Sequence, residues 1–94
     1  MDKNQLFQAI SRYLEKNGAK KVMVFGSYAR GEATKNSDVD IIVEFSHGKS
    51  LLDLVGLEQE LSDLVGVKID LHTKQSISPY IKRRVLREAQ VIHS

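Results

Sequence analysis

The sequence predicts an α/β fold in which helices and strands alternate through a single domain, residues 1–94. Apolar residues switch along the chain between the three-and-four spacing of helices and the period of two of strands, which predicts the order α-β-α-β-α-β-α. The chain has 94 residues, 41% hydrophobic and 28% charged, as in an ordinary folded protein with one modest core. No repeat or linker interrupts the alternation, so we expect a small mixed sheet of about three to four strands covered by helices.

A helix, a strand and a short helix are expected first. Residues 4–16 carry apolar side chains on one helical face: Leu6, Phe7, Ile10, Tyr13 and Leu14. Lys21–Phe25 is a β-branched and aromatic run that breaks at Gly26, which predicts a strand followed by a turn. The turn opens a short helix over residues 27–32.

Two strands and two helices are expected next. In the segment 38–45 polar and apolar residues alternate, so Asp38, Asp40, Ile42 and Glu44 share one face of a strand. Residues 50–64 predict a helix over the sheet, with Leu51, Leu54, Val55, Leu61 and Leu64 as its apolar stripe. Residues 67–72 predict a third strand, and Ser78-Pro79 starts a last helix that runs to about Gln90.

Composition excludes several classes of function. There is no cysteine, which excludes disulfides and thiolate chemistry, and no apolar run approaches the roughly 20 residues of a membrane span. We therefore expect a cytoplasmic protein that does not bind membranes. The net charge is only +2, so nucleic-acid binding is not expected. A basic cluster in the last helix is interpreted as a solvated face: Lys82, Arg83, Arg84 and Arg87.

Three aspartates fall on predicted strands, where charged groups need a reason. Asp38 and Asp40 share a face, and Asp70 comes from the next strand. Such a set of oxygen ligands suits Mg²⁺ or Mn²⁺, and two ions could stabilise an in-line phosphoryl displacement while Asp70 helps to take the acceptor proton. Alone, however, a D-x-D also fits a strand edge that faces water. His72, on the face of Asp70, could approach the site or simply face solvent.

The segment GSYARG, residues 26–31, lies where a strand opens into a helix. Gly26 permits close approach of the main chain, and Ser27 with the first backbone N–H groups would bind the phosphates of a nucleotide. Arg30 can bind phosphate oxygens through its forked guanidinium. A plain turn with an exposed arginine would look the same.

Together the two motifs favour a functional site over a plain turn and a solvent-facing strand edge. They form the pattern G-S-x10-D-x-D, in which ten positions separate Gly26-Ser27 from Asp38-x-Asp40. The run GSYARGEATKNSDVDIIVEF resembles the minimal nucleotidyltransferases of the DNA polymerase β superfamily, the MNT domains that pair with HEPN proteins in prokaryotic toxin–antitoxin operons. The resemblance extends from Val22 through Asp70 and covers nearly the whole chain with its flanking helices.

The resemblance implies a polymerase β-like nucleotidyltransferase fold and a role for each matching residue. Gly26 and Ser27 would bind the triphosphate and Arg30 would support it. Asp38, Asp40 and Asp70 would bind two Mg²⁺ ions, with Mn²⁺ as a substitute. The chain would be an antitoxin that transfers AMP from ATP to a hydroxyl, most plausibly of a tyrosine, on a HEPN ribonuclease toxin with which it forms a hetero-oligomer.

Two alternatives stay open at this point. A non-catalytic antitoxin could neutralise the toxin by binding alone, although three clustered carboxylates would then only repel one another. A small-molecule nucleotidyltransferase, like the antibiotic-modifying members of the superfamily, would need a further substrate domain for which 94 residues leave no room.

Overall fold

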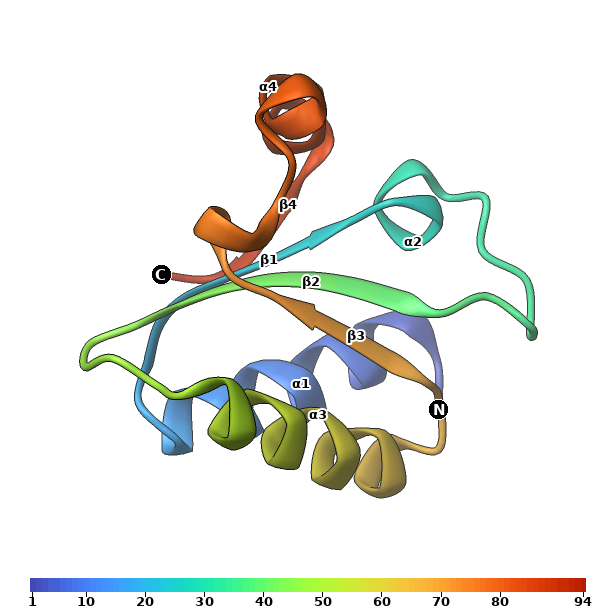
Figure 1. The fold of residues 1–94 in the computed structure, drawn as a ribbon. Coiled ribbons are helices and arrows are strands. Elements are labelled where there is room, and N and C mark those ends of the chain that lie inside the picture. Colours follow the sequence, from blue (N-terminus) through green and yellow to red (C-terminus); the bar gives the residue numbers. More distant parts are fainter.

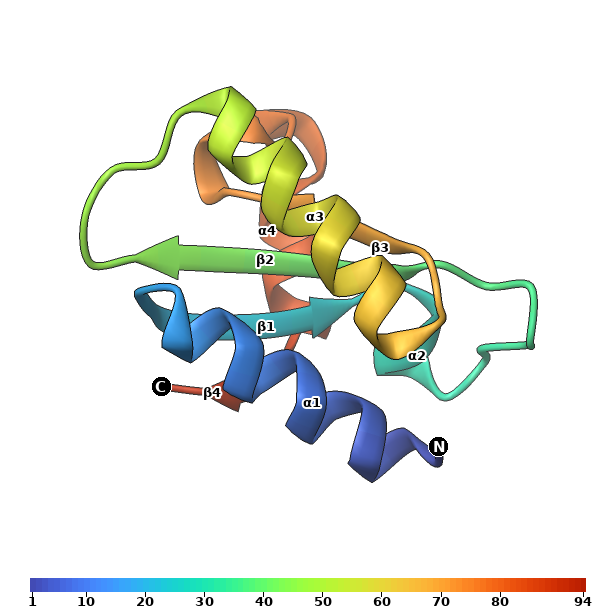
Figure 2. The same cartoon turned by 90° about the horizontal axis from the view of Figure 1, so that it is seen from below.

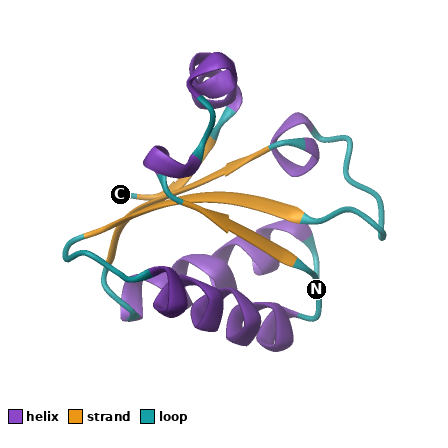
Figure 3. Ribbon diagram, viewed as in Figure 1, coloured by secondary structure: helices purple, strands orange, loops and turns teal.

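The computed structural model describes residues 1–94, and its centre is one mixed sheet (Figures 1 and 3). Its strands lie in the order β3 (Ile69–His72), β2 (Val39–Phe45), β1 (Ala19–Phe25) and β4 (Gln90–His93). β1 is antiparallel to β2 and β4, whereas β2 and β3 are parallel. The parallel pair is joined by a helical crossover, as such pairs require.

Helices lie on both faces of the sheet. α1 (Lys3–Lys16) and α3 (Leu51–Val65) lie side by side over one face, which Figure 2 shows from below. The single-turn helix η1 (Lys74–Ser76) leads to α4 (Pro79–Glu88), which lies over the opposite face, while α2 (Ser27–Arg30) follows the end of β1 (Figure 1). None of these helices combines the length and apolarity that a bilayer crossing demands.

The alternation along β2 decides which face carries polar groups. Val39, Ile41 and Val43 are buried in the larger core under α1 and α3. Ile42 points to the other face and joins a smaller core under α4: Met23, Ile42, Ile77 and Val85. Asp40 shares the face of Ile42, so the functional side of the sheet is the one that the smaller core leaves partly open.

The predicted fold class is confirmed, and one element is added. We expected the last helix to continue to about Gln90, but it ends at Glu88 and Gln90–His93 forms β4 against β1. The Ser11 hydroxyl donates a hydrogen bond to the Ile92 carbonyl at 2.9 Å, which holds this strand on α1. Four residues at a chain end give too short a pattern to predict a strand; the free edge of β1 supplies the reason for one.

The predicted apolar stripe of α3 is partly wrong. Leu54 and Leu61 pack on the core as expected, but Leu51, Val55 and Leu64 are exposed and Leu57 and Val65 take their place. The sequence offers apolar residues around most of this helix, so periodicity alone could not select the buried face.

Two leucines near the C-terminus of α3 provide a test of which face of this helix is buried. Leu61 is fully buried and Leu64 is 61% exposed. Leu61→Ala should lower the free energy of unfolding by about 2–5 kcal/mol, because it leaves a cavity in the core. Leu64→Ala should change it by less than about 0.5 kcal/mol. Urea denaturation of both variants measures the difference. Equal losses of unfolding free energy would contradict the buried face described for α3.

Candidate active site

The parallel pairing of β2 with β3 places two carboxylates side by side. Asp40 is the register partner of Asp70, and Ile42 is the partner of His72. Ligand atoms of Asp40, Asp70 and His72 lie within 4.8 Å of one another, and all three side chains are partly exposed. The His72 Nε2 lies 3.9 Å from an oxygen of Asp70. The structure therefore gathers two carboxylates and an imidazole at one point of the open face.

Side chains of α3 fix β3, and with it Asp70. The Ser62 hydroxyl accepts a hydrogen bond from the Ile69 N–H at 2.9 Å, and the Glu58 carboxylate accepts one from the Leu71 N–H at 2.8 Å. β3 is an edge strand whose outer N–H groups would otherwise lack protein partners. The two residues that flank Asp70 are thus tied to the helix behind them.

Asp38 lies just before β2 and is not in the group of Asp40, Asp70 and His72. One of its oxygens lies 3.6 Å from the ammonium of Lys68, an ion pair between half-exposed and exposed groups. Such a surface pair is weak. The Asp38 carboxylate, predicted as a ligand, is therefore close to the site but paired with Lys68.

Gly26 allows the close approach of the main chain that we expected in the GSYARG segment. It follows Phe25, the register partner of Asp40, and has a φ of 72° and a ψ of −150°. A Cβ built there would overlap the Oδ2 atom of Asp40. Glycine thus satisfies a backbone conformation that other residues rarely adopt and leaves the space that the carboxylate occupies.

Ser27 begins α2 directly beside this contact. The first hydrogen bonds of α2 are donated by Ala29 and Arg30 to the Gly26 carbonyl, each at 3.1 Å. The N–H groups of Ser27 and Tyr28 precede them and have no intrahelical partner. Donor groups are therefore available next to Asp40, as binding of phosphate oxygens requires.

Arg30 is positioned by carboxylates instead of pointing freely into the site. Its guanidinium lies 2.6 Å from Glu32 and 3.2 Å from Glu88 at the end of α4. A shallow cavity of about 400 Å³ lies here, lined by Phe25, Gly26, Arg30, Arg84, Val85 and Glu88. Sequence reasoning predicted the position of Arg30 next to the turn but not these partners, because Glu88 is distant in sequence.

The charges around Asp40 affect its pKa. Burial raises the pKa of Asp40 above its usual 3.8, and the neighbouring charge of Asp70 raises it further. His72 and Arg30 act in the opposite direction, while Asp38 adds a smaller increase to the same pKa. Burial and the charge of Asp70 therefore destabilise ionised Asp40, and a bound cation would offset this cost.

The donor set fits a divalent cation. Asp40 and Asp70 supply hard oxygen atoms, and Asp38 can join them by leaving its weak pair with Lys68. His72 adds a nitrogen ligand, which Mn²⁺ accepts more readily than Mg²⁺ does. His72 also packs against the Phe25 ring, with centroids 5.6 Å apart, so its ring is held near the carboxylates. The sequence signalled this histidine only by its shared face with Asp70.

Comparison with known proteins gives an independent result. The profile of the nucleotidyltransferase domain matches residues 5–92. A protein of Methanocaldococcus jannaschii assigned as a protein adenylyltransferase is 48% identical over 89 residues, covering 95% of this chain and 96% of the relative.

Two solved structures share the fold. A minimal nucleotidyltransferase is 40% identical with a TM-score of 0.80, covering 96% of this chain and 95% of that one. A chain from a toxin–antitoxin crystal structure with AMP-PNP is 25% identical with a TM-score of 0.81, covering 92% of this chain and 71% of that one.

The contact between Gly26 and Asp40 can be tested with a second glycine. Gly26→Ala should displace the Asp40 carboxylate and remove Mn²⁺ binding, because the added methyl group occupies its place. Gly31 also has a positive φ, 74°, but nothing lies within 4 Å of a Cβ there. Gly31→Ala should cost about 1 kcal/mol of stability and keep Mn²⁺ binding. Calorimetric Mn²⁺ titration compares the two; retained binding in Gly26→Ala would contradict the packing described.

The repulsion at Asp40 predicts the effect of its removal on stability. Because the folded protein holds the Asp40 proton more tightly than the unfolded chain, ionising this group costs stability as the pH rises through the raised pKa. In EDTA at neutral pH, Asp40→Asn should melt at or above the wild-type temperature, and the difference should vanish near pH 4. A variant that melts lower at neutral pH would show that the carboxylate is structural.

Proposed function

The chain belongs to the nucleotidyltransferase domain family, and from this premise we propose that it is a metal-dependent protein adenylyltransferase. It transfers AMP from ATP to a hydroxyl of a HEPN toxin and thereby acts as an antitoxin. The observation that carries this proposal is the Asp40–Asp70 pair beside the Gly26 turn, which joins a cation site to a phosphate site.

The similar proteins support the donor and the partner. The relative from M. jannaschii is assigned to protein adenylyl transfer and matches nearly the whole chain. The toxin–antitoxin structure with AMP-PNP supports both an ATP-like donor and a toxin partner. The HEPN class of that partner follows from the resemblance of residues 26–45 to MNT antitoxins.

We assign binding of the triphosphate to the turn that follows β1. Gly26 brings the main chain close to the site, and the N–H groups of Ser27 and Tyr28 donate to phosphate oxygens. Arg30 exchanges Glu32 or Glu88 for a phosphate, since guanidinium binds both kinds of oxyanion in the same geometry.

We assign cation binding to Asp40 and Asp70, with Asp38 and His72 as the further ligands. Two Mg²⁺ ions, or Mn²⁺, would supply charge stabilisation for the attacking and leaving oxygens of the displacement. The carboxylates hold that charge against the sheet, and the backbone bonds to Ser62 and Glu58 keep Asp70 in register.

The proposed reaction moves one nucleotidyl group. The acceptor hydroxyl oxygen forms a bond to the α-phosphorus of ATP, and the bond from that phosphorus to the bridging oxygen of the β-phosphate breaks. Pyrophosphate leaves, and Asp70 accepts the hydroxyl proton. Positioning of the two reactants supplies most of the acceleration in such transfers.

The acceptor brings its own binding energy, because the cavity beside the Gly26 turn is shallow and lined by only six residues. A folded toxin that docks over the α4 face can present a tyrosine hydroxyl in line with the α-phosphate. We therefore propose a hetero-oligomer with the toxin in the cytoplasm, where ATP is available.

Intact-mass spectrometry of the toxin tests the proposal. Incubation with this protein, ATP and Mg²⁺ should add one or more AMP increments to the toxin. Asp40→Asn and Asp38→Asn should lower the rate at least about a hundredfold, because each removes a negative charge from the cation site. Asp63→Asn, on the exposed side of α3, serves as the control and should transfer AMP normally. An unmodified toxin that is still inhibited in a stable complex would instead identify a binding-only antitoxin.

A further inference from the structure

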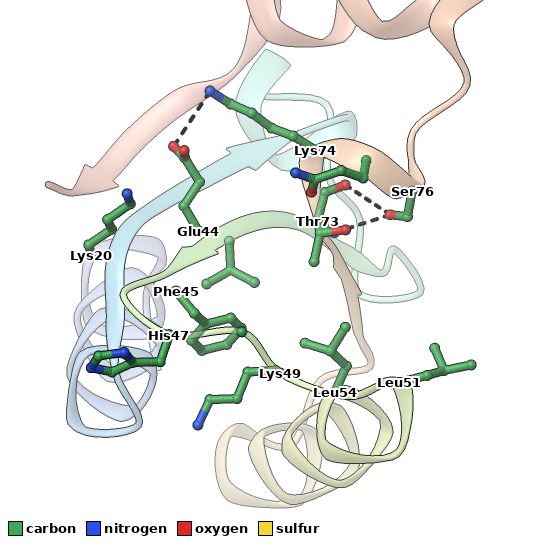
Figure 4. A pocket seen from close by; sticks show the side chains of 13 residues that line it. Lys20, Glu44, Phe45, His47, Lys49, Leu51, Leu54, Thr73, Lys74 and Ser76 are labelled. Atoms are coloured by element: carbon green, nitrogen blue, oxygen red, sulfur yellow. Dashed lines mark hydrogen bonds and ion pairs between the residues drawn. The ribbon is translucent and has the colours of Figure 1, made fainter.

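A second cavity lies at the far end of β2 from Asp40 and has no part in the reaction described. It has a volume of about 500 Å³ and lies among the β1 and β2 ends, the loop before α3, and η1 (Figure 4). β3 pairs with β2 only as far as Ile42, so Glu44 and Phe45 extend beyond their neighbouring strand into this region. The early end of β3 is what leaves the space open.

Cationic side chains dominate the lining. Lys20, Lys49, Lys74 and His47 face only one carboxylate, Glu44. Glu44 is paired with Lys74 at 3.6 Å, which leaves Lys20 and Lys49 without a carboxylate partner in the lining. Figure 4 shows Lys20, His47 and Lys49 on one side of the cavity and Leu51 and Leu54 on the other. The cavity therefore has a positive side and an apolar side.

The apolar side continues onto the surface of α3. Leu51 is 78% exposed, Leu52 is 80% exposed, and Val55 is 53% exposed, all within five consecutive residues. Single exposed leucines are common, but a cluster beside a charged cavity is the composition of a protein interface, apolar at its centre and charged at its rim.

The cavity is aligned with the active site. Asp40 and Glu44 lie on the same face of β2, and four strand residues span about 13 Å. Thr73 and Lys74, which line the cavity, follow His72 directly in the chain. Ile42 lies between Asp40 and Glu44 on this face and is buried in the smaller core under α4, so a bound partner would reach the active site and the cavity from outside η1 and α4.

We propose that this cavity and its leucine rim bind an acidic segment of the protein that receives AMP. The proposal rests on the proposed function for the identity of the acceptor, and on charge complementarity for the acidic segment. Protein is favoured over nucleic acid because only Phe45 and His47 offer rings for base stacking, and the Lys49 ammonium already lies 5.4 Å from the centroid of the Phe45 ring. A phosphate backbone would also bury little of the apolar surface of the exposed leucines.

Peptide titration of the ¹⁵N-labelled full chain tests this. The probe is a peptide of glutamate and leucine without hydroxyl residues, and the matched probe replaces glutamate by glutamine. The acidic peptide should shift the resonances of residues 44–51 and 73–76 and bind at least about tenfold tighter than its neutral match. The difference should shrink from 50 to 500 mM salt.

The double variant Lys20→Glu, Lys49→Glu should lower the affinity for the acidic peptide at least about tenfold, because it reverses the charge of two lysines that line the cavity. Arg12→Glu with Lys35→Glu changes the net charge equally at exposed positions elsewhere and should bind as wild type. Equal weakening in both, no shifts at the cavity, or tighter binding of oligouridylate than of the peptide would overturn the proposal.

AMP transfer to the toxin is measured on the same samples. Lys20→Glu with Lys49→Glu should raise the KM for the toxin and leave the KM for ATP unchanged. Normal transfer without peptide binding would reject the docking cavity but leave the proposed function standing. Peptide binding without any transfer would instead reject the proposed function.

Discussion

The site depends on the parallel register of β2 and β3. Only in that register do Asp40 and Asp70 become neighbours, and a shift by one residue would turn one carboxylate into the apolar core. Two like charges at this distance oppose the pairing, so the register must be enforced from elsewhere. The apolar residues on the other face supply that force, since Val39, Ile41 and Ile69 are all buried under the helices.

The second support of the register comes from α3. Glu58 and Ser62 bond the N–H groups on either side of Asp70, so the helix that covers the core also closes the edge of the sheet. These residues belong to the polar side of an apparently ordinary helix, and nothing in the sequence distinguishes them from solvent-facing positions. A change at Glu58 would therefore affect the site through β3 without touching substrate.

Local pattern predicted most of the fold and part of the site. The period of two in residues 38–45 and 67–72 placed Asp40 and Asp70 correctly on open faces, and the Gly26 turn was recognised by its spacing from Asp38. What failed required partners distant in sequence. The buried face of α3 depends on the sheet beneath it, β4 pairs with the free edge of β1, and Asp38 forms an ion pair with Lys68 on the loop before β3. The roles of the individual site residues remain predictions.

Arg30 shows how the fold can hold a residue that we propose to bind phosphate while leaving it free to change partners. The Arg30 guanidinium and the carboxylates of Glu32 and Glu88 are exposed enough for water to screen them, so each ion pair is weak. A triphosphate would offer more negative charge than either glutamate, each of which makes a single contact with Arg30, and it would also accept from the nearby N–H groups of α2. We therefore expect phosphate to replace a glutamate at Arg30, and replacement of Glu88 would free that side chain on α4.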